Sequence, residues 1–151
     1  MLDIEDFKKS IGNKSRLLGI DPGKKRIGLA ISDEDKLVST PLKTILKKKF
    51  FDFIKEIKEI IEENNIKGIV VGNPLNMDGS KGSSSQSSND FARNLSNNIS
   101  IPITMWDERL SSEDAFKITK ELETNTTNRV SKLDKNAAAY ILQGAIDYLS
   151  N

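Results

Sequence analysis

The 151-residue chain contains no histidine and no cysteine. The absence of histidine excludes a Ser-His-Asp triad, a histidine general base and a histidine-ligated zinc. The absence of cysteine excludes a disulfide framework, a thiolate nucleophile and a zinc–thiolate site, and it agrees with a reducing cytosol. Any catalysis must therefore depend on carboxylates, Lys, Arg, hydroxyl groups or a metal ion with oxygen ligands.

Long apolar runs are also absent. No segment approaches the length of a membrane span, and Asp3, Glu5 and Asp6 interrupt the start of the chain, so it shows no signal-peptide pattern. We therefore expect no membrane partner. Apolar residues make up 36% of the chain and charged residues 30%, which is typical of one soluble globular domain.

Charge is spread unevenly along the chain, although its formal net value is only +1. Residues 1–50 contain 12 Lys and Arg against 7 Asp and Glu, whereas residues 51–151 contain 11 against 15. A basic first third is compatible with a polyanionic partner. Surface lysines that keep a protein soluble would give the same count.

Residues 17–31 predict two apolar strands joined by a tight basic turn. Alternation places Leu18 and Ile20 on one face of the first strand and Asp21 on the other. The Asp-Pro-Gly turn follows, in which Gly23 tolerates a positive φ. A carboxylate held beside cations and backbone N–H groups suits a metal ion, or a metal with a phosphate. The alternative is that Asp21 merely starts the turn.

The remaining pattern predicts a third, edge-like strand interrupted by Pro41, followed by helices alternating with two buried strands. Apolar residues recur at helical spacing from Phe50 to Ile61. The serine-rich segment 83–88 is expected to be flexible filler, that is, a connection without a structural role. The polar segment 123–130 is expected to be a loop. The expected elements are helices near 1–14, 48–64, 91–98, 111–122 and 132–149, and strands near 37–44, 68–72 and 101–106.

This order of elements predicts an α/β fold. Three antiparallel strands come first, and right-handed crossovers then set two further strands beside the first one. The result is a mixed five-stranded sheet in the order 3-2-1-4-5, with strand 2 antiparallel, flanked by helices. The carboxyl ends of strands 1, 4 and 5 converge, and they bring together Asp21, the 73–82 segment, Asp107 and Glu108.

Asp134 joins this group from the last helix. It stands one turn before Ala138 on the apolar stripe, where an aspartate is costly unless it is paired or ligated. The alternative is that Asp134 caps the start of the helix. Clustered carboxylates repel one another unless a cation is bound. Two Mg²⁺ or Mn²⁺ ions would relieve that repulsion and support in-line phosphodiester hydrolysis.

Four segments, taken together and in order, resemble the signatures of the YqgF/RuvX family over roughly residues 16–150: 21–28, 72–79, 107–112 and 134–138. The resemblance implies the three-layer, RNase H-like fold of the Holliday junction resolvases. It also implies a cytoplasmic, metal-dependent nuclease that processes the 5′ end of pre-16S rRNA. The implied alternative is a Holliday junction resolvase, which would work as a homodimer because a junction needs two symmetric active sites.

The resemblance also implies roles for individual residues. Asp21, Glu108 and Asp134 would be catalytic and would hold the metal, with Asp107 as a further ligand. Strand alternation lets only one of Asp107 and Glu108 point into the site, and Glu108 is the preferred one. Contacts to the nucleic-acid substrate are expected from Lys24, Lys25, Arg26, Asn73, Asn76, Lys81 and Arg109.

Some features depart from the family pattern. Residues 1–14 precede the pattern and are expected to form an N-terminal extension to a nuclease domain over 15–151. A clear fourth carboxylate is absent near Asp134, because Ala137 and Ala138 stand there. A non-catalytic nucleic-acid-binding module of the same fold is therefore a second alternative. A sugar-kinase or actin-like ATPase shares the Asp-x-Gly hairpin, but it needs two such domains to enclose its nucleotide.

Overall fold

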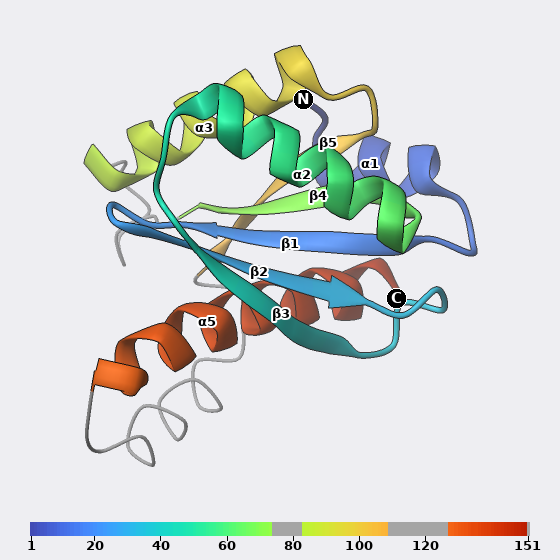
Figure 1. Cartoon of the computed structure of the whole chain (residues 1–151). Helices are drawn as coiled ribbons and strands as arrows, with labels where there is room; N and C mark the ends of the chain where they lie inside the picture. Colours follow the sequence, from blue (N-terminus) through green and yellow to red (C-terminus); the bar gives the residue numbers. More distant parts are fainter. Residues whose placement is uncertain (74–82, 109–126, 151) are drawn as a thin grey trace.

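A mixed five-stranded sheet lies at the centre of the molecule, with helices on both of its faces (Figure 1). The computed structural model describes residues 1–73, 83–108 and 127–150, and only the backbone of 83–85 and 127–136. The elements are α1 (Ile4–Ile11), β1 (Arg16–Pro22), β2 (Arg26–Ser32), β3 (Ser39–Leu46), α2 (Phe50–Asn64), β4 (Ile66–Asn73), α3 (Ser83–Asn98), β5 (Ile103–Asp107) and α5 (Thr127–Leu149).

The strand order β3-β2-β1-β4-β5 confirms the predicted topology. β1 and β2 are antiparallel, as are β2 and β3, whereas β1, β4 and β5 run parallel. In the register, Ile20 pairs with Val71, and Asn73 pairs with Asp107. The carboxyl ends of β1, β4 and β5 therefore lie together, and we call this side of the sheet the carboxyl edge.

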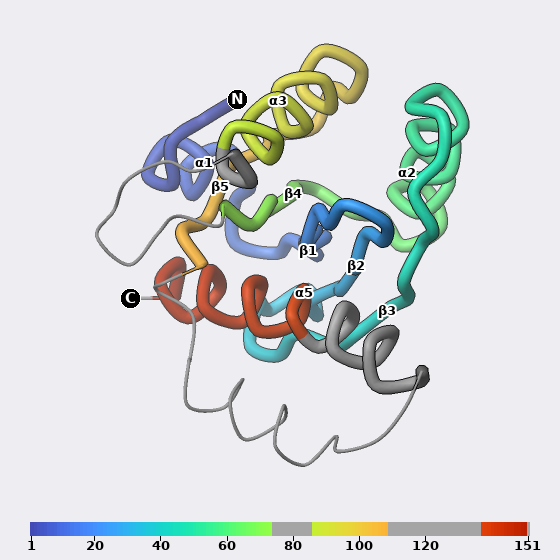
Figure 2. Tube along the Cα trace, turned by 90° about the vertical axis from the view of Figure 1, so that its left-hand side faces the viewer, coloured from blue at the N-terminus to red at the C-terminus, as the bar shows by residue number. Residues whose placement is uncertain are grey.

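Apolar side chains fill both faces of the sheet, as the alternation predicts. Leu18 and Ile20 pack with α2 and α3 in one buried cluster. Leu17 belongs to a second cluster on the opposite face, with α1 and α5. Figure 2 shows α2 and α5 on opposite sides of the sheet. Asp21 alternates with Ile20, so it lies on the α5 face at the end of β1.

Helix α5 lies directly against β1 because Gly19 has no side chain. A Cβ at Gly19 would come within 2.8 Å of Leu142 Cβ and 3.3 Å of the Ala138 backbone oxygen. Ala138, Leu142 and Ala145 are fully buried, which confirms the predicted apolar stripe of this helix. Close contact of this kind fixes the height of α5 above the sheet.

The N-terminal residues pack on the same face. Phe7 of α1 is fully buried, and a Cβ at Gly68 would come within 2.8 Å of its ring. Leu2 forms a bridge to Thr104 of β5, and its N–H donates to the Ile103 carbonyl at 2.9 Å. A helix thus forms within 1–14, while the division of the chain at residue 14 stays a prediction.

The serine-rich run was wrongly expected to be filler, because helix α3 already begins at Ser83. Ser88 is buried and continues the spacing of Ala92, Leu95 and Ile99, so it belongs to the helix stripe. A serine costs a helix only a fraction of a kcal/mol, which packing overrides. Helix α5 likewise begins at Thr127, inside the expected polar loop.

Smaller differences concern strand ends and turns. β3 begins at Ser39, so the exposed Leu37 and Val38 precede it. Gly23 does not adopt a positive φ; its need for glycine is steric, since a Cβ would lie 2.3 Å from the Arg26 backbone oxygen. The helix expected over 111–122 lies outside the described residues. No helix in the described part of the chain is long and apolar enough to cross a membrane.

Candidate active site

Asp21 and Glu108 meet at the carboxyl edge. Asp21 lies near the end of β1 and Glu108 directly follows β5, and their carboxyl groups share a hydrogen bond. The structure therefore brings together two acids that are 87 positions apart in the sequence.

Gly72 makes this meeting possible. β4 lies between β1 and β5, so the Glu108 side chain has to cross β4 to reach Asp21. A Cβ at Gly72 would come within 2.8 Å of Glu108 Oε1 and 2.7 Å of Ile141 Cδ1. The missing side chain leaves space for the carboxylate. Sequence reasoning placed Gly72 in a motif without giving it this role; its signal is a glycine in a β-branched strand.

The surroundings of Glu108 disfavour its charged form. Burial is the largest cause that raises the pKa of Glu108, and the nearby charge of Asp107 raises the pKa further, while the hydrogen bond with Asp21 opposes both effects. Acidic oxygens held close together and partly withdrawn from water are the ligands that Mg²⁺ and Mn²⁺ prefer. The donor set present therefore fits a hard divalent cation.

A third ligand is not described. Among the side chains that the structure describes, in 1–73, 86–108 and 137–150, no three from His, Cys, Asp or Glu group closely enough to hold a metal. The side chain of Asp134 lies outside the described part of the structure. Its backbone belongs to α5, one turn before Ala138, and Figure 1 shows α5 starting on the side of the sheet where β1 turns into β2. The placement of Asp134 in the site stays a prediction.

The expected substrate contacts divide into two groups. Lys24 and Lys25 are exposed in the β1–β2 turn, Arg26 is half-buried beside them, and Asn73 ends β4 at the carboxyl edge. These four residues lie at or next to the strand ends that form the carboxyl edge. Asn76, Lys81 and Arg109 lie outside the described residues.

This sheet order is that of an RNase H-like fold of the RuvC type. T. thermophilus RuvC in complex with Holliday junction substrate superposes on the chain with a TM-score of 0.54. The match covers 91% of this chain and 96% of that one, and at 12% identity it shows the fold alone.

The chain belongs to the RuvX family. The family model, described as Holliday junction resolvase, matches residues 15–148. A relative from Pelagibacter ubique is 54% identical over 151 residues, covering 100% of both chains. One from Ruegeria pomeroyi is 47% identical over 148 residues, covering 98% of this chain and 96% of the relative. Both relatives carry the name "Putative pre-16S rRNA nuclease". The resemblance inferred from the four segments is thereby confirmed.

Proposed function

We propose that the protein is a metal-dependent nuclease of the cytoplasm that processes the 5′ end of pre-16S rRNA. The observation that carries the proposal is the Asp21–Glu108 pair, which the fold assembles across Gly72 at the carboxyl edge. The names of relatives that align over nearly the full length support the choice of substrate. The lack of histidine and cysteine excludes imidazole and thiol groups from the site, and carboxylates are among the groups that remain to act as acid or base.

Asp21, Glu108 and Asp134 would hold two Mg²⁺ or Mn²⁺ ions, with Asp107 as a further candidate ligand. When bound, such ions supply an activated water and stabilise the leaving oxygen of a phosphodiester. The protein supplies the fixed positions. Glu108 is held by burial and by its contact with Asp21, and α5 is held by its contact with Gly19. Lys24, Lys25 and Arg26 would bind the phosphate backbone next to the scissile bond, together with Asn73, Asn76, Lys81 and Arg109.

The test is the variant Asp21→Asn, which keeps the shape of the side chain and its capacity to hydrogen-bond with Glu108. We expect wild-type circular dichroism and thermal stability, with loss of Mg²⁺- and Mn²⁺-dependent cleavage of a precursor rRNA fragment. Asp90→Asn is the matched control, because Asp90 is exposed on α3 and its carboxylate, 59% exposed, pairs only weakly with Arg93 at 3.7 Å. Undiminished cleavage by Asp21→Asn would contradict the proposal.

The description of the family model favours a second candidate, a Holliday junction resolvase. That activity needs two symmetric sites and therefore a homodimer. Cleavage of a four-way DNA junction and of a precursor rRNA should be compared side by side, with Mg²⁺, with Mn²⁺ and with EDTA, alongside the oligomeric state in solution. Junction cleavage by a dimer would favour the resolvase. Binding to RNA without cleavage in either metal would favour a non-catalytic module.

A further inference from the structure

Exposed aromatic and basic side chains gather where β3 leads into α2. Phe51 is 80% exposed, Leu46 68% and Phe50 36%. These are three of the seven large hydrophobic side chains that are exposed in the described residues, and they lie within six positions of one another. Lys47 and Lys49 are exposed between them. We call these five residues the β3–α2 patch.

The helix does not use this surface for packing. Phe53, Ile54 and Ile57 bury the inner side of α2 against the sheet, whereas Phe51 lies outside that stripe. Phe50 was expected to begin the apolar stripe, and the structure leaves it at the margin. A large aromatic side chain that remains in water gains nothing for the fold.

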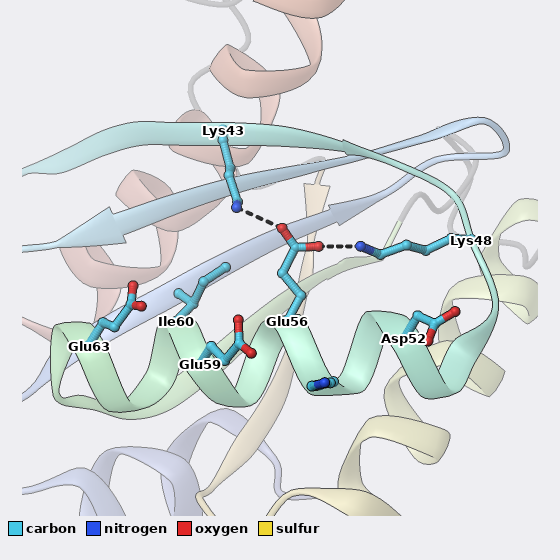
Figure 3. A pocket seen from close by; sticks show the side chains of 8 residues that line it. Lys43, Lys48, Asp52, Glu56, Glu59, Ile60 and Glu63 are labelled. Carbon is cyan, nitrogen blue, oxygen red and sulfur yellow. Dashed lines mark hydrogen bonds and ion pairs between the residues drawn. The ribbon is translucent and has the colours of Figure 1, made fainter.

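Two ion pairs, from Lys43 and Lys48 to Glu56, join α2 to β3 and to the segment between them, beside the patch. Figure 3 shows Glu56 between Lys43 and Lys48, at 2.7 Å and 2.6 Å. Lys48 is thereby turned toward α2. Lys47 and Lys49, the residues directly before and after Lys48, are both exposed. Within the described part of the chain, Lys47 and Lys49 have no ion-pair partner.

The patch lies at the same end of the sheet as the candidate active site. The N–H of Lys47 donates to the carbonyl of Lys25 at 2.8 Å, which ties the patch to the basic turn after Asp21. β3 runs parallel to β1, so both strands end on the same side of the sheet. The two strands are separated only by β2, a span of about 10 Å. Lys24 and Lys25 lie in between and are exposed.

We propose that the β3–α2 patch binds a single-stranded segment of the nucleic-acid substrate next to the cleavage site. An unpaired base would stack on Phe51, while Lys47 and Lys49 contact the phosphates on either side. Stacking on an exposed aromatic ring requires an unpaired base, because the bases of a duplex already stack on one another. The inference rests on the proposed nuclease function and specifies its substrate as unpaired at this position.

The test measures binding in EDTA, where cleavage does not interfere. Fluorescence anisotropy is recorded with a labelled single-stranded RNA of about 16 nucleotides, with the corresponding RNA duplex, and with a four-way DNA junction. Phe51→Ala should weaken single-strand binding about 5- to 150-fold and leave duplex binding unchanged. The double variant Lys47→Ala/Lys49→Ala should lower the dependence of log K on log salt by about 1.4.

Matched controls lie at the opposite end of the sheet. Leu37→Ala removes a side chain that is 63% exposed, and Lys9→Ala/Lys67→Ala removes two exposed lysines. All these side chains are at the surface, so the thermal midpoint of each variant should equal that of the wild type. Phe51→Trp should retain single-strand affinity, and the RNA should quench its fluorescence, whereas the buried Trp106 of the wild type should respond little.

Wild-type single-strand affinity in Phe51→Ala would overturn the inference. So would an equal loss for the duplex, an equal loss in Leu37→Ala, or unquenched Phe51→Trp. Failure of the proposed function gives a different result: the wild type would cleave neither RNA nor junction, while single-strand binding would still depend on Phe51. Conversely, the wild type could cleave in a metal-dependent way while Phe51→Ala kept wild-type single-strand affinity. That result would contradict this inference and leave the proposed function standing.

Discussion

The carboxylate of Glu108 lies where a side chain on Gly72 would have to be. A Cβ at Gly72 would come within 2.8 Å of Glu108 Oε1, and Glu108 uses the space to reach Asp21. The site therefore depends on the absence of a side chain at Gly72 as well as on its two acids.

Gly72→Ala should remove cleavage, because the added methyl group pushes Glu108 away from Asp21. Overpacking against Ile141 should also cost about 1–3 kcal/mol of unfolding free energy, measured by urea titration. Gly68→Ala is the control on the same strand, since its Cβ would meet Phe7 at 2.8 Å, far from the site. A fully folded Gly68→Ala protein should keep its activity. An equal loss of cleavage in both variants would show that cleavage is lost through destabilisation and not through displacement of Glu108.

Gly19→Ala should lift α5 from β1 and displace Asp134 with it. The Ala138 backbone oxygen, 3.3 Å from the new Cβ, can move only with the helix. We expect lost cleavage and a destabilisation of about 1–3 kcal/mol. Leu142→Ala should cost more, about 2–5 kcal/mol, yet keep activity in the folded protein, because it leaves a cavity without pushing the helix away. Wild-type cleavage by Gly19→Ala would contradict a role for α5 in the site.

Glu108→Gln should stabilise the metal-free protein at pH values above the raised pKa of Glu108, while removing activity. Burial raises the pKa of Glu108 above its ordinary value, so the folded state binds the proton more tightly than the unfolded state. Wild-type stability should therefore fall as pH rises between the ordinary and the raised pKa, and the variant should lack that fall. Thermal unfolding in EDTA at several pH values measures the difference. A variant that is less stable than the wild type at high pH would count against this reading.

Glu56→Gln should weaken the fold by about 1 kcal/mol at neutral pH, because Glu56 holds two lysines and is only 21% exposed. Lys43 and Lys48 lower the pKa of Glu56, so its contribution is complete above the ordinary glutamate pKa. That contribution disappears as pH falls through the lowered pKa, where variant and wild type should converge. Glu59→Gln, on the same helix and the same pocket wall (Figure 3), is the control.

The alternation of apolar residues and the right-handed crossover rule were enough to predict the strand order of the sheet and the strands that meet at its carboxyl edge. Leu18 and Ile20 face α2 and α3 as their spacing predicts, and Asp21 ends β1 where strands 4 and 5 also end. Alternation predicted that only one of Asp107 and Glu108 points into the site, without choosing between them, and the structure places Glu108 beside Asp21. Its catalytic role, like that of Asp134, stays a prediction.

Features that depend on space between distant residues could not be read from local pattern. The structural role of Gly72 depends on the side chain of Glu108, which lies 36 positions later in the chain. Ser88 entered a helix because it lies on the stripe of Ala92, which composition alone does not reveal. The exposure of Phe51 likewise follows from the packing of α2, in which Phe53 occupies the inner face of the helix.

The two margins of the sheet have a consequence for self-association. Leu2 pairs with the outer side of β5, and on the other margin β3 carries Pro41, which has no N–H to donate, beside an irregularity in its register with β2. Within the described residues, neither margin offers an uninterrupted row of backbone donors and acceptors to a second copy. Association of two copies by strand addition is therefore disfavoured at these positions of β5 and β3.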